Sequence, residues 1–202
     1  MEHSADPNAS LYASGNPLSR ADNNRDEKMK GLLFRYGVEL DPITAGLEGE
    51  TSVAAVTLQN DVTLAQDLLW AADCGGDPNV VGMCLRHLDW ADEDKRCFDL
   101  LEQPLRQWSL GPHRKYRDFD HKVYFEIFEM ILSHGASPNI IGRFGYRLAQ
   151  HLAACGVVWK EPIMTGTDRI KFAIIWLKYK VDLNVIDDLL QSTPLSWVVR
   201  WG

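Results

Sequence analysis

The chain has 202 residues, of which 46% are hydrophobic and 24% charged, and its formal net charge is −7 at pH 7. This composition is that of a globular protein with enough apolar material for a core. The acidic balance argues against tight non-specific nucleic-acid binding, which needs Lys and Arg to neutralise phosphates, and no segment approaches the roughly 20 apolar residues of a membrane helix.

The start of the chain and its cysteines bear on its location in the cell. Residues 1–15 are polar, without the basic start and apolar stretch of a signal peptide. Cys74, Cys84, Cys97 and Cys155 show neither C-x-x-C spacing nor the density of a disulfide scaffold, so reduced, partly buried thiols are expected. These features predict a protein of the cytoplasm or the nucleus, with no membrane partner.

A short turn motif recurs along the chain, and each copy ends on Asn or Asp. The copies end at Asn8, Asp41, Asn79, Asn139 and Asn184. The first interval is the shortest, and a motif that returns after about 33 residues is typical of a helical repeat array. The longer intervals are interpreted as the same unit carrying insertions.

Ahead of most of these turns, apolar residues follow the i, i+3, i+4, i+7 spacing that gives a helix one apolar face. The four predicted faces are Met29, Leu32, Leu33 and Tyr36; Ala65, Leu68, Leu69 and Ala72; Tyr124, Ile127, Phe128 and Ile131; and Ile170, Ala173, Ile174 and Leu177. Each helix is expected to bury its face against its neighbours.

The ends of these helices carry recognisable signals. Asp61 and Asp168 are predicted to accept hydrogen bonds from N–H groups of a first helical turn. Gly37, Gly75 and Gly135 are predicted to end helices, because glycine adopts the left-handed backbone without steric cost.

A second, shorter helix is predicted before each of the longer ones. The clearest case is residues 192–202, where Thr193 is the expected cap, Pro194 lies in the first turn, and Leu195 with Val198 or Val199 faces inward. Weaker versions lie at 15–21, 49–56 and 142–156. The repeating unit is therefore turn, short helix, longer helix, glycine, turn.

Two segments of this unit resemble the ankyrin repeat. Residues 192–202 resemble the family's Thr-Pro-Leu-His helix opening, with Ser196 in place of His. Residues 131–139 resemble the helix end followed by Gly-Ala-Asp-x-Asn, with Ser137 in place of Asp. The resemblance implies an all-α, ankyrin-type helical repeat solenoid of paired antiparallel helices. It also implies a non-catalytic module or scaffold that binds one or more partner proteins.

The turns divide residues 1–202 into a single repeat array. Its parts are a remnant at 1–8, repeats at about 9–41, 42–79, 80–139 and 140–184, and an incomplete repeat at 185–202. The third repeat carries an insertion near 92–118, where "CFDLLEQPLRQW" is predicted to add a helix that packs through Phe98, Leu101, Leu105 and Trp108. The incomplete repeat is expected to leave an apolar helix without a second helix after it.

Two groups of residues have the types that catalysis or metal binding needs. Asp118, Asp120 and His121 have the spacing of an acid/base or metal cluster, but one of the aspartates is better explained as the cap of a following helix. Cys84 and His87 lie on one helix face, without signs of an orienting group or an oxyanion pocket. We therefore predict no enzyme, and no catalytic, cofactor-binding or metal-binding residue.

Alternatives to a partner-binding module centre on the insertion. Together with the basic segment "HRKYR" at 113–117, residues 92–118 would form the ligand site of an accessory or enzymatic protein in a biosynthetic pathway. A further alternative is a nuclear regulatory protein. We favour neither, and a solvated loop explains the basic segment better than a nucleic-acid patch does.

Partner binding is predicted on a row of loop tips that follow the recurring turns. The tips are residues 9–15, 42–50, 80–83 and 140–146. Arg143, Phe144 and Tyr146 are the predicted partner-binding residues, because Arg and aromatic side chains dominate interface energetics. Packing of Phe144 between turns is the competing interpretation. The partner is expected to be a protein, and neither nucleic acid nor a small molecule is expected.

Overall fold

The structure is a computed structural model that describes residue 8 and residues 16–24, 26–89, 95–110, 122–142, 147–154, 165–188 and 190–201. These residues form helices joined by turns, and no strand occurs among them apart from an isolated antiparallel bridge between Ile141 and Arg147. The all-α prediction is confirmed for this part of the chain. No helix within these ranges has both the length and the apolar character needed to cross a membrane.

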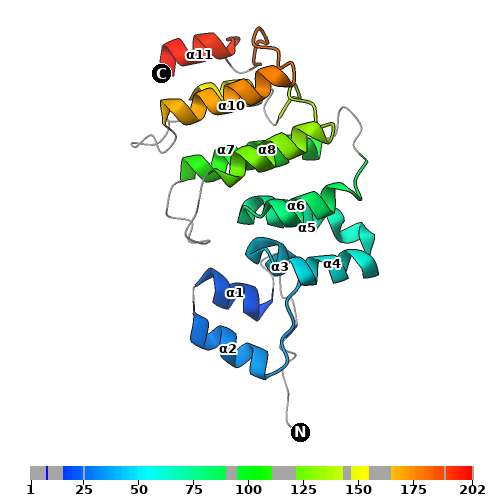
Figure 1. The fold of residues 1–202 in the computed structure, drawn as a ribbon. Helices are drawn as coiled ribbons and strands as arrows, with labels where there is room; N and C mark the ends of the chain where they lie inside the picture. Colours follow the sequence, from blue (N-terminus) through cyan, green and yellow to red (C-terminus); the bar gives the residue numbers. More distant parts are fainter. Residues whose placement is uncertain are drawn as a thin grey trace. The chain divides into compact units, whose positions relative to one another are not determined.

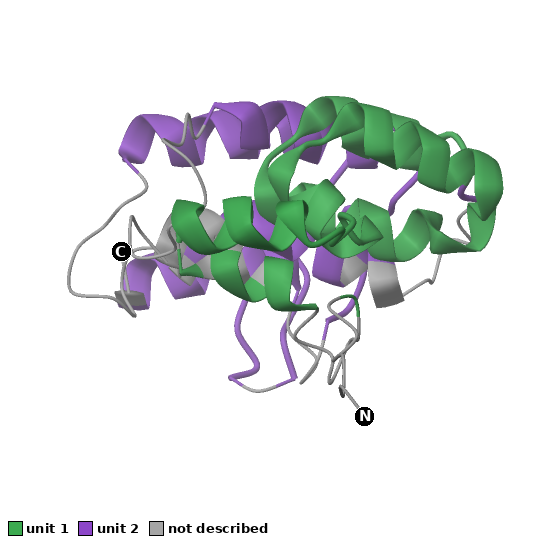
Figure 2. Ribbon diagram, turned by 90° about the horizontal axis from the view of Figure 1, so that it is seen from below, with its two compact units in different colours: residues 1–87, 115–119 green, residues 88–114, 120–202 purple. Residues whose placement is uncertain are grey.

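The chain divides into two compact units (Figure 2). The first comprises residues 1–87 with 115–119, and the second comprises residues 88–114 with 120–202. The helices of the first unit are α1 (Pro17–Asn23), α2 (Glu27–Arg35), α3 (Pro42–Glu48), α4 (Thr51–Asn60), the short 3-10 helix η1 (Val62–Leu64), α5 (Ala65–Gly75) and α6 (Pro78–Leu85) (Figure 1).

Helix α5 forms the centre of the first unit. Its predicted face is fully buried and packs with α3 and α6; the residues are Ala65, Leu68, Leu69 and Ala72. Asp61 accepts from the Thr63 N–H at 2.9 Å, which confirms the predicted cap at the start of η1. The spacing of the apolar residues was sufficient here because helices cover α5 on more than one side.

Two predicted loop tips are helices instead. Residues 42–50 contain α3 and residues 80–83 lie within α6. Asp41 accepts from the Thr44 N–H at 3.0 Å, Asp77 accepts from the Asn79 and Val80 N–H groups at 3.0 Å, and a proline follows each aspartate. An Asp-Pro pair starts a helix at once, because the carboxylate caps it and the proline needs no hydrogen-bond partner there. The predicted short helix at 49–56 is present as α4, so α3 is the helix that the sequence analysis did not predict.

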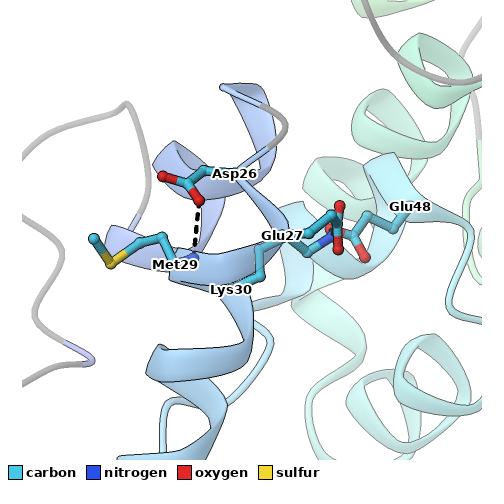
Figure 3. Close-up of polar contacts among 5 residues, drawn as sticks. All are labelled: Asp26, Glu27, Met29, Lys30 and Glu48. Carbon is cyan, nitrogen blue, oxygen red and sulfur yellow. Dashed lines mark hydrogen bonds and ion pairs between the residues drawn. The ribbon is translucent and has the colours of Figure 1, made fainter.

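The predicted core face of α2 is wrong. Met29, Leu32 and Tyr36 are exposed, and α2 contains no buried residue. A polar contact joins α2 to α3, because the Lys30 ammonium lies 3.2 Å from the Glu48 carboxylate. Met29 lies on the other side of the helix from this contact (Figure 3). Helical spacing therefore identified an apolar face here, but the helices in the described part of the chain do not bury it.

The second unit contains the predicted insertion helix. Its helices are α7 (Lys95–Leu110), α8 (Val123–Ser133), α9 (Leu148–Ala154), α10 (Gly166–Lys178) and α11 (Pro194–Trp201). Helix α7 spans the stretch "CFDLLEQPLRQW" and buries Leu101 and Leu105, as predicted. The predicted face of α8 is also buried, through Tyr124, Ile127, Phe128 and Ile131.

Helix α10 buries a different face from the predicted one. Phe172 and Trp176 are buried, and their rings lie 5.2 and 5.5 Å from the Phe128 ring of α8. Ile170, Ile174 and Leu177 are exposed. The large aromatic side chains gain more from burial than the aliphatic ones, so they decide which side of α10 packs on α8.

Two of the recurring turns are tied to a later turn by the same pair of hydrogen bonds. In each, the carboxamide of the closing Asn accepts from one backbone N–H and donates to a backbone carbonyl two residues earlier. The pairs are Asn8 with Glu39 N (3.0 Å) and Gly37 O (3.4 Å), and Asn139 with Asp182 N (2.7 Å) and Lys180 O (3.2 Å). The sequence repeat is therefore a repeat of backbone geometry at these turns, one in each unit.

The signals at the helix ends are partly confirmed. Gly37 and Gly135 have the predicted left-handed backbone, with φ of 77° and 107°. The prediction for Gly75 is wrong, because Gly75 is the last residue of α5 and Gly76 is the left-handed one, with φ of 72°. Asp168 does not cap α10. Thr165 is the cap, and Asp168 accepts from its N–H at 3.2 Å in a reciprocal capping box.

At the end of α10 a lysine occupies the left-handed position. Lys180 has φ of 61°, a backbone conformation that costs a side chain about 1–2 kcal/mol. We expect Lys180→Gly to raise the free energy of unfolding by about 1 kcal/mol, measured by urea denaturation, because relief of this strain exceeds the entropy cost of glycine. The control is Lys171→Gly in the interior of α10, which is expected to lower it by about 1 kcal/mol. A Lys180→Gly variant less stable than the wild type would contradict this account.

Candidate functional site

An apolar groove lies in the second unit, bordered by α9, α10 and α11. Its volume is about 520 Å³. Most of its lining is aliphatic, with Leu152 from α9, Ile170 and Leu177 from α10, and Leu195 and Val198 from α11. We call it the α10–α11 groove. Its size lies within the range of about 300–1,000 Å³ that is usual for binding sites.

Helix α10 contributes the wall of the groove through its second apolar face. Its aromatic face packs on α8, while Ile170, Ala173 and Leu177 line the groove at i, i+3 and i+7. Ile170 and Leu177 are 61% and 57% exposed. A helix that has two apolar faces is normally covered on both. In the described structure the groove face of α10 is largely exposed.

Helix α11 is held in place by the buried carboxylate of Asp187. This carboxylate accepts hydrogen bonds from the indole N–H of Trp197 at 2.8 Å and from the backbone N–H of Ser192 at 3.1 Å. Thr193 caps α11 by accepting from the Ser196 N–H at 3.3 Å, as predicted. Trp197 is thus engaged within the chain.

The inward orientation predicted for α11 is wrong. Leu195, Val198 and Val199 are exposed, with Leu195 at 70%. The bond between Trp197 and Asp187 fixes the rotation of α11 and leaves its aliphatic side outside the core. Leu195 and Val198 consequently form the second wall of the groove.

A buried glutamine connects α9 to the segment that leads into α11. Gln150 is fully buried, and its side-chain amide donates to the carbonyls of Val185 at 3.2 Å and Ser192 at 3.4 Å. Its side-chain oxygen accepts from the Arg147 N–H at 3.2 Å. Because satisfied buried networks rigidify their surroundings, α9 and α11 present the groove as a preformed surface.

The groove carries positive charge and two unsatisfied donors. Arg169 is the one charged residue among the described residues that line it. Its Nε is buried without a hydrogen-bond partner in the described part of the chain, and the same is true of Trp176 Nε1. Both residues line the groove from α10. A buried donor without a partner costs free energy.

The partner-binding residues predicted from the sequence, Arg143, Phe144 and Tyr146, lie outside the described residues. Their flanks, Ile141 and Arg147, are joined by the isolated bridge. Residues 9–15, the other predicted loop tip, also lie outside the described residues. The prediction for these tips therefore stays a prediction.

The structure describes only some of the residues considered for catalysis. Asp118, Asp120, His121 and the basic segment 113–117 lie outside the described residues. Cys84 is buried, which raises the pKa of its thiol to about 12, whereas His87 is exposed. Burial thus keeps the Cys84 thiol protonated and works against a nucleophilic thiolate. Among the residues that the structure describes, no three His, Cys, Asp or Glu side chains gather into a site for a metal ion.

Comparison with protein-family models, with curated proteins and with solved structures found no match.

The sequence analysis identified most of the groove residues on α10 and α11 but assigned them to the core. The signal that the sequence analysis did not use lies in the residue pattern of α10. Its aromatic residues and its aliphatic residues have separate helical spacings, which predicts two faces and two packing partners.

Proposed function

We propose that this chain is a non-catalytic protein-interaction module built from ankyrin-like repeats, and that the α10–α11 groove is its partner-binding surface. The exposed aliphatic lining of a preformed groove is the observation that carries this proposal. The repeated bonds from Asn8 and Asn139 to a later turn support the repeat architecture. Arrays of this type commonly present rigid binding surfaces to other proteins.

The free energy available in the groove favours a macromolecular partner. Ile170, Leu177 and Leu195 are each more than half exposed. Full burial of such a side chain contributes about 1.5–3 kcal/mol, so three of them can supply the apolar centre of an interface. Arg143, Phe144 and Tyr146 remain a proposed second contact.

Two isoleucines on α10 allow a matched test. Ile170 and Ile174 are both 61% exposed, but of the two only Ile170 lines the groove. We expect Ile170→Gln to reduce capture of a partner protein about tenfold, because it removes apolar burial from the interface. Capture by Ile174→Gln should match the wild type. The measurement is affinity capture from the native cells with quantitative mass spectrometry.

Both variants should keep the circular dichroism spectrum and thermal midpoint of the wild type, because the replaced side chains are exposed and Gln is a good helix former. If every captured protein binds both variants equally, the groove is not the partner-binding surface. Conversion of a small molecule by the purified chain would instead favour an enzymatic role.

A further inference from the structure

We infer that the α10–α11 groove takes an amphipathic helix of the partner, with an acidic side chain of that helix placed against Arg169. This inference rests on the proposed function and specifies the chemistry of the partner. Three features of the groove carry it, which are its shape, the exposure of its aliphatic side chains and its charge.

The shape of the groove matches a helix. Ile170, Ala173 and Leu177 follow one another along α10 at i, i+3 and i+7, a stripe about 10 Å long. An adjacent face of α10 already packs on a helix, α8, through aromatic contacts of 5.2 and 5.5 Å. Figure 1 shows α11 on the other side of α10 from α8. A helix laid along the stripe would pack against both α10 and α11.

The exposure of the aliphatic side chains along the groove argues for an occupant wider than a small molecule. Leu195 is 70% exposed, and Ile170 and Leu177 are also mostly exposed. A helix with side chains has a diameter of about 10–12 Å and would cover both walls at once. A small ligand at the bottom of the groove would leave these side chains in water.

The charge of the groove specifies an acidic residue on that helix. Arg169 is the single charged residue among the described lining residues, and its Nε is buried without a partner there. The neighbouring carboxylate of Asp168 is engaged with Thr165 in the capping box. A carboxylate brought in by the partner would form a charge-assisted hydrogen bond with the Arg169 guanidinium.

The position of Arg169 also sets the location of the acidic residue. Arg169 lies near the start of α10. The acidic residue therefore lies near one end of the bound segment.

A set of synthetic peptides tests this inference without knowledge of the natural partner. The probe is a fluorescein-labelled helical peptide of about five turns, with leucines at i, i+3, i+4 and i+7 and one glutamate at the border of the leucine face. A matched peptide replaces this glutamate by glutamine. A third carries a central proline, which breaks the helix. Binding to the full chain is measured by fluorescence anisotropy.

We expect the wild type to bind the glutamate peptide about tenfold more tightly than the glutamine peptide, because a hydrogen bond between charged groups strengthens binding by about this factor. Arg169→Gln should bind the two peptides equally. Ile170→Gln should weaken both helical peptides about tenfold, while Ile174→Gln changes neither. The proline peptide should bind at least about tenfold more weakly than its helical counterpart.

Several outcomes would overturn the inference. Equal binding of the glutamate and glutamine peptides to the wild type would contradict the proposed acidic residue of the partner, and this comparison needs no variant of the protein. Equal binding of the helical and proline peptides would contradict the proposed helical conformation of the partner segment. Binding of decanoate that depends on Ile170, with no peptide binding, would make the groove a small-molecule site. Ile170-dependent capture of a cellular protein, combined with either peptide failure, would leave the proposed function standing.

Discussion

Replacing Gly75 by Ala is expected to lower the free energy of unfolding of the first unit by about 3 kcal/mol, at the upper end of the usual cost of overpacking. Gly75 is the buried last residue of α5. A Cβ at this position would lie 2.9 Å from the carbonyl carbon and the Cα of Leu47, at the end of α3, and closer still to the Leu47 carbonyl oxygen. Because these are backbone atoms, relief requires a shift of α3.

Close approach of α3 to α5 is a feature of both helices. At Gly46 of α3, a Cβ would lie 2.7 Å from the Ala71 Cβ and 3.0 Å from the Leu68 carbonyl oxygen of α5. Small residues on both helices thus allow their backbones to approach, and this contact places α5 at the centre of the unit. The cost expected for Gly75→Ala is the cost of separating these two helices.

Gly31→Ala in α2 is the control for this prediction. A Cβ at Gly31 meets nothing within 4 Å, so alanine should raise the free energy of unfolding by up to about 1 kcal/mol through helix propensity alone. Urea denaturation followed by circular dichroism measures both variants. A Gly75→Ala variant as stable as the wild type would show that α3 and α5 do not pack this closely.

Much of the fold could be predicted because its signals are local. The spacing of Leu68 and Leu69, or of Ile127 and Phe128, identified the buried side of α5 and α8, each of which packs with other helices of its unit. Helix α7 was predicted in the same way. Turn residues such as Gly37 were predicted because the left-handed backbone strongly prefers glycine.

The failures share a different physical origin. Helical spacing shows that Met29 and Leu32 share a face, but the presence of a helix to cover that face depends on the rest of the chain. On α10 two apolar faces compete, and burial of Phe172 and Trp176 leaves Ile170 to the groove. The groove combines residues from 149 to 198, so its hollow depends on how α9, α10 and α11 pack. Spacing within one helix contains no information about that packing.

Replacing Asp73 by Asn is expected to stabilise the first unit at neutral pH. Asp73 of α5 is fully buried, and neither carboxylate oxygen has a hydrogen-bond partner among the described residues. Burial raises the pKa of this carboxyl well above its ordinary value of 3.8, because desolvation disfavours the charged form. At neutral pH the native state therefore bears either a proton taken from solvent or an unpaired buried charge, and both carry a free-energy cost.

The sign of the pH dependence follows from proton linkage. Above the ordinary pKa of 3.8, the unfolded state loses the Asp73 proton while the native state retains it, so the native state binds more protons. The contribution of Asp73 to stability therefore falls by about 1.4 kcal/mol per pH unit as the pH rises from this value. It levels off once the pH exceeds the raised pKa of the native state.

Asparagine carries no charge at any pH, so Asp73→Asn removes this dependence. We expect the variant to be about as stable as the wild type near pH 4, and more stable by about 2 kcal/mol or more at pH 7, the order of the penalty for an unpaired buried charged group. The measurement is urea denaturation of both proteins from pH 4 to pH 8.

Asp67→Asn is the control on the same helix. Asp67 is exposed in the first turn of α5, so its replacement should change the free energy of unfolding by less than about 1 kcal/mol. Two outcomes would contradict this account. The difference in unfolding free energy between Asp73→Asn and the wild type could stay constant across this pH range, or the variant could be the less stable protein at pH 7. Either result would show that Asp73 is ionised in the native state and has a partner that stabilises its charge.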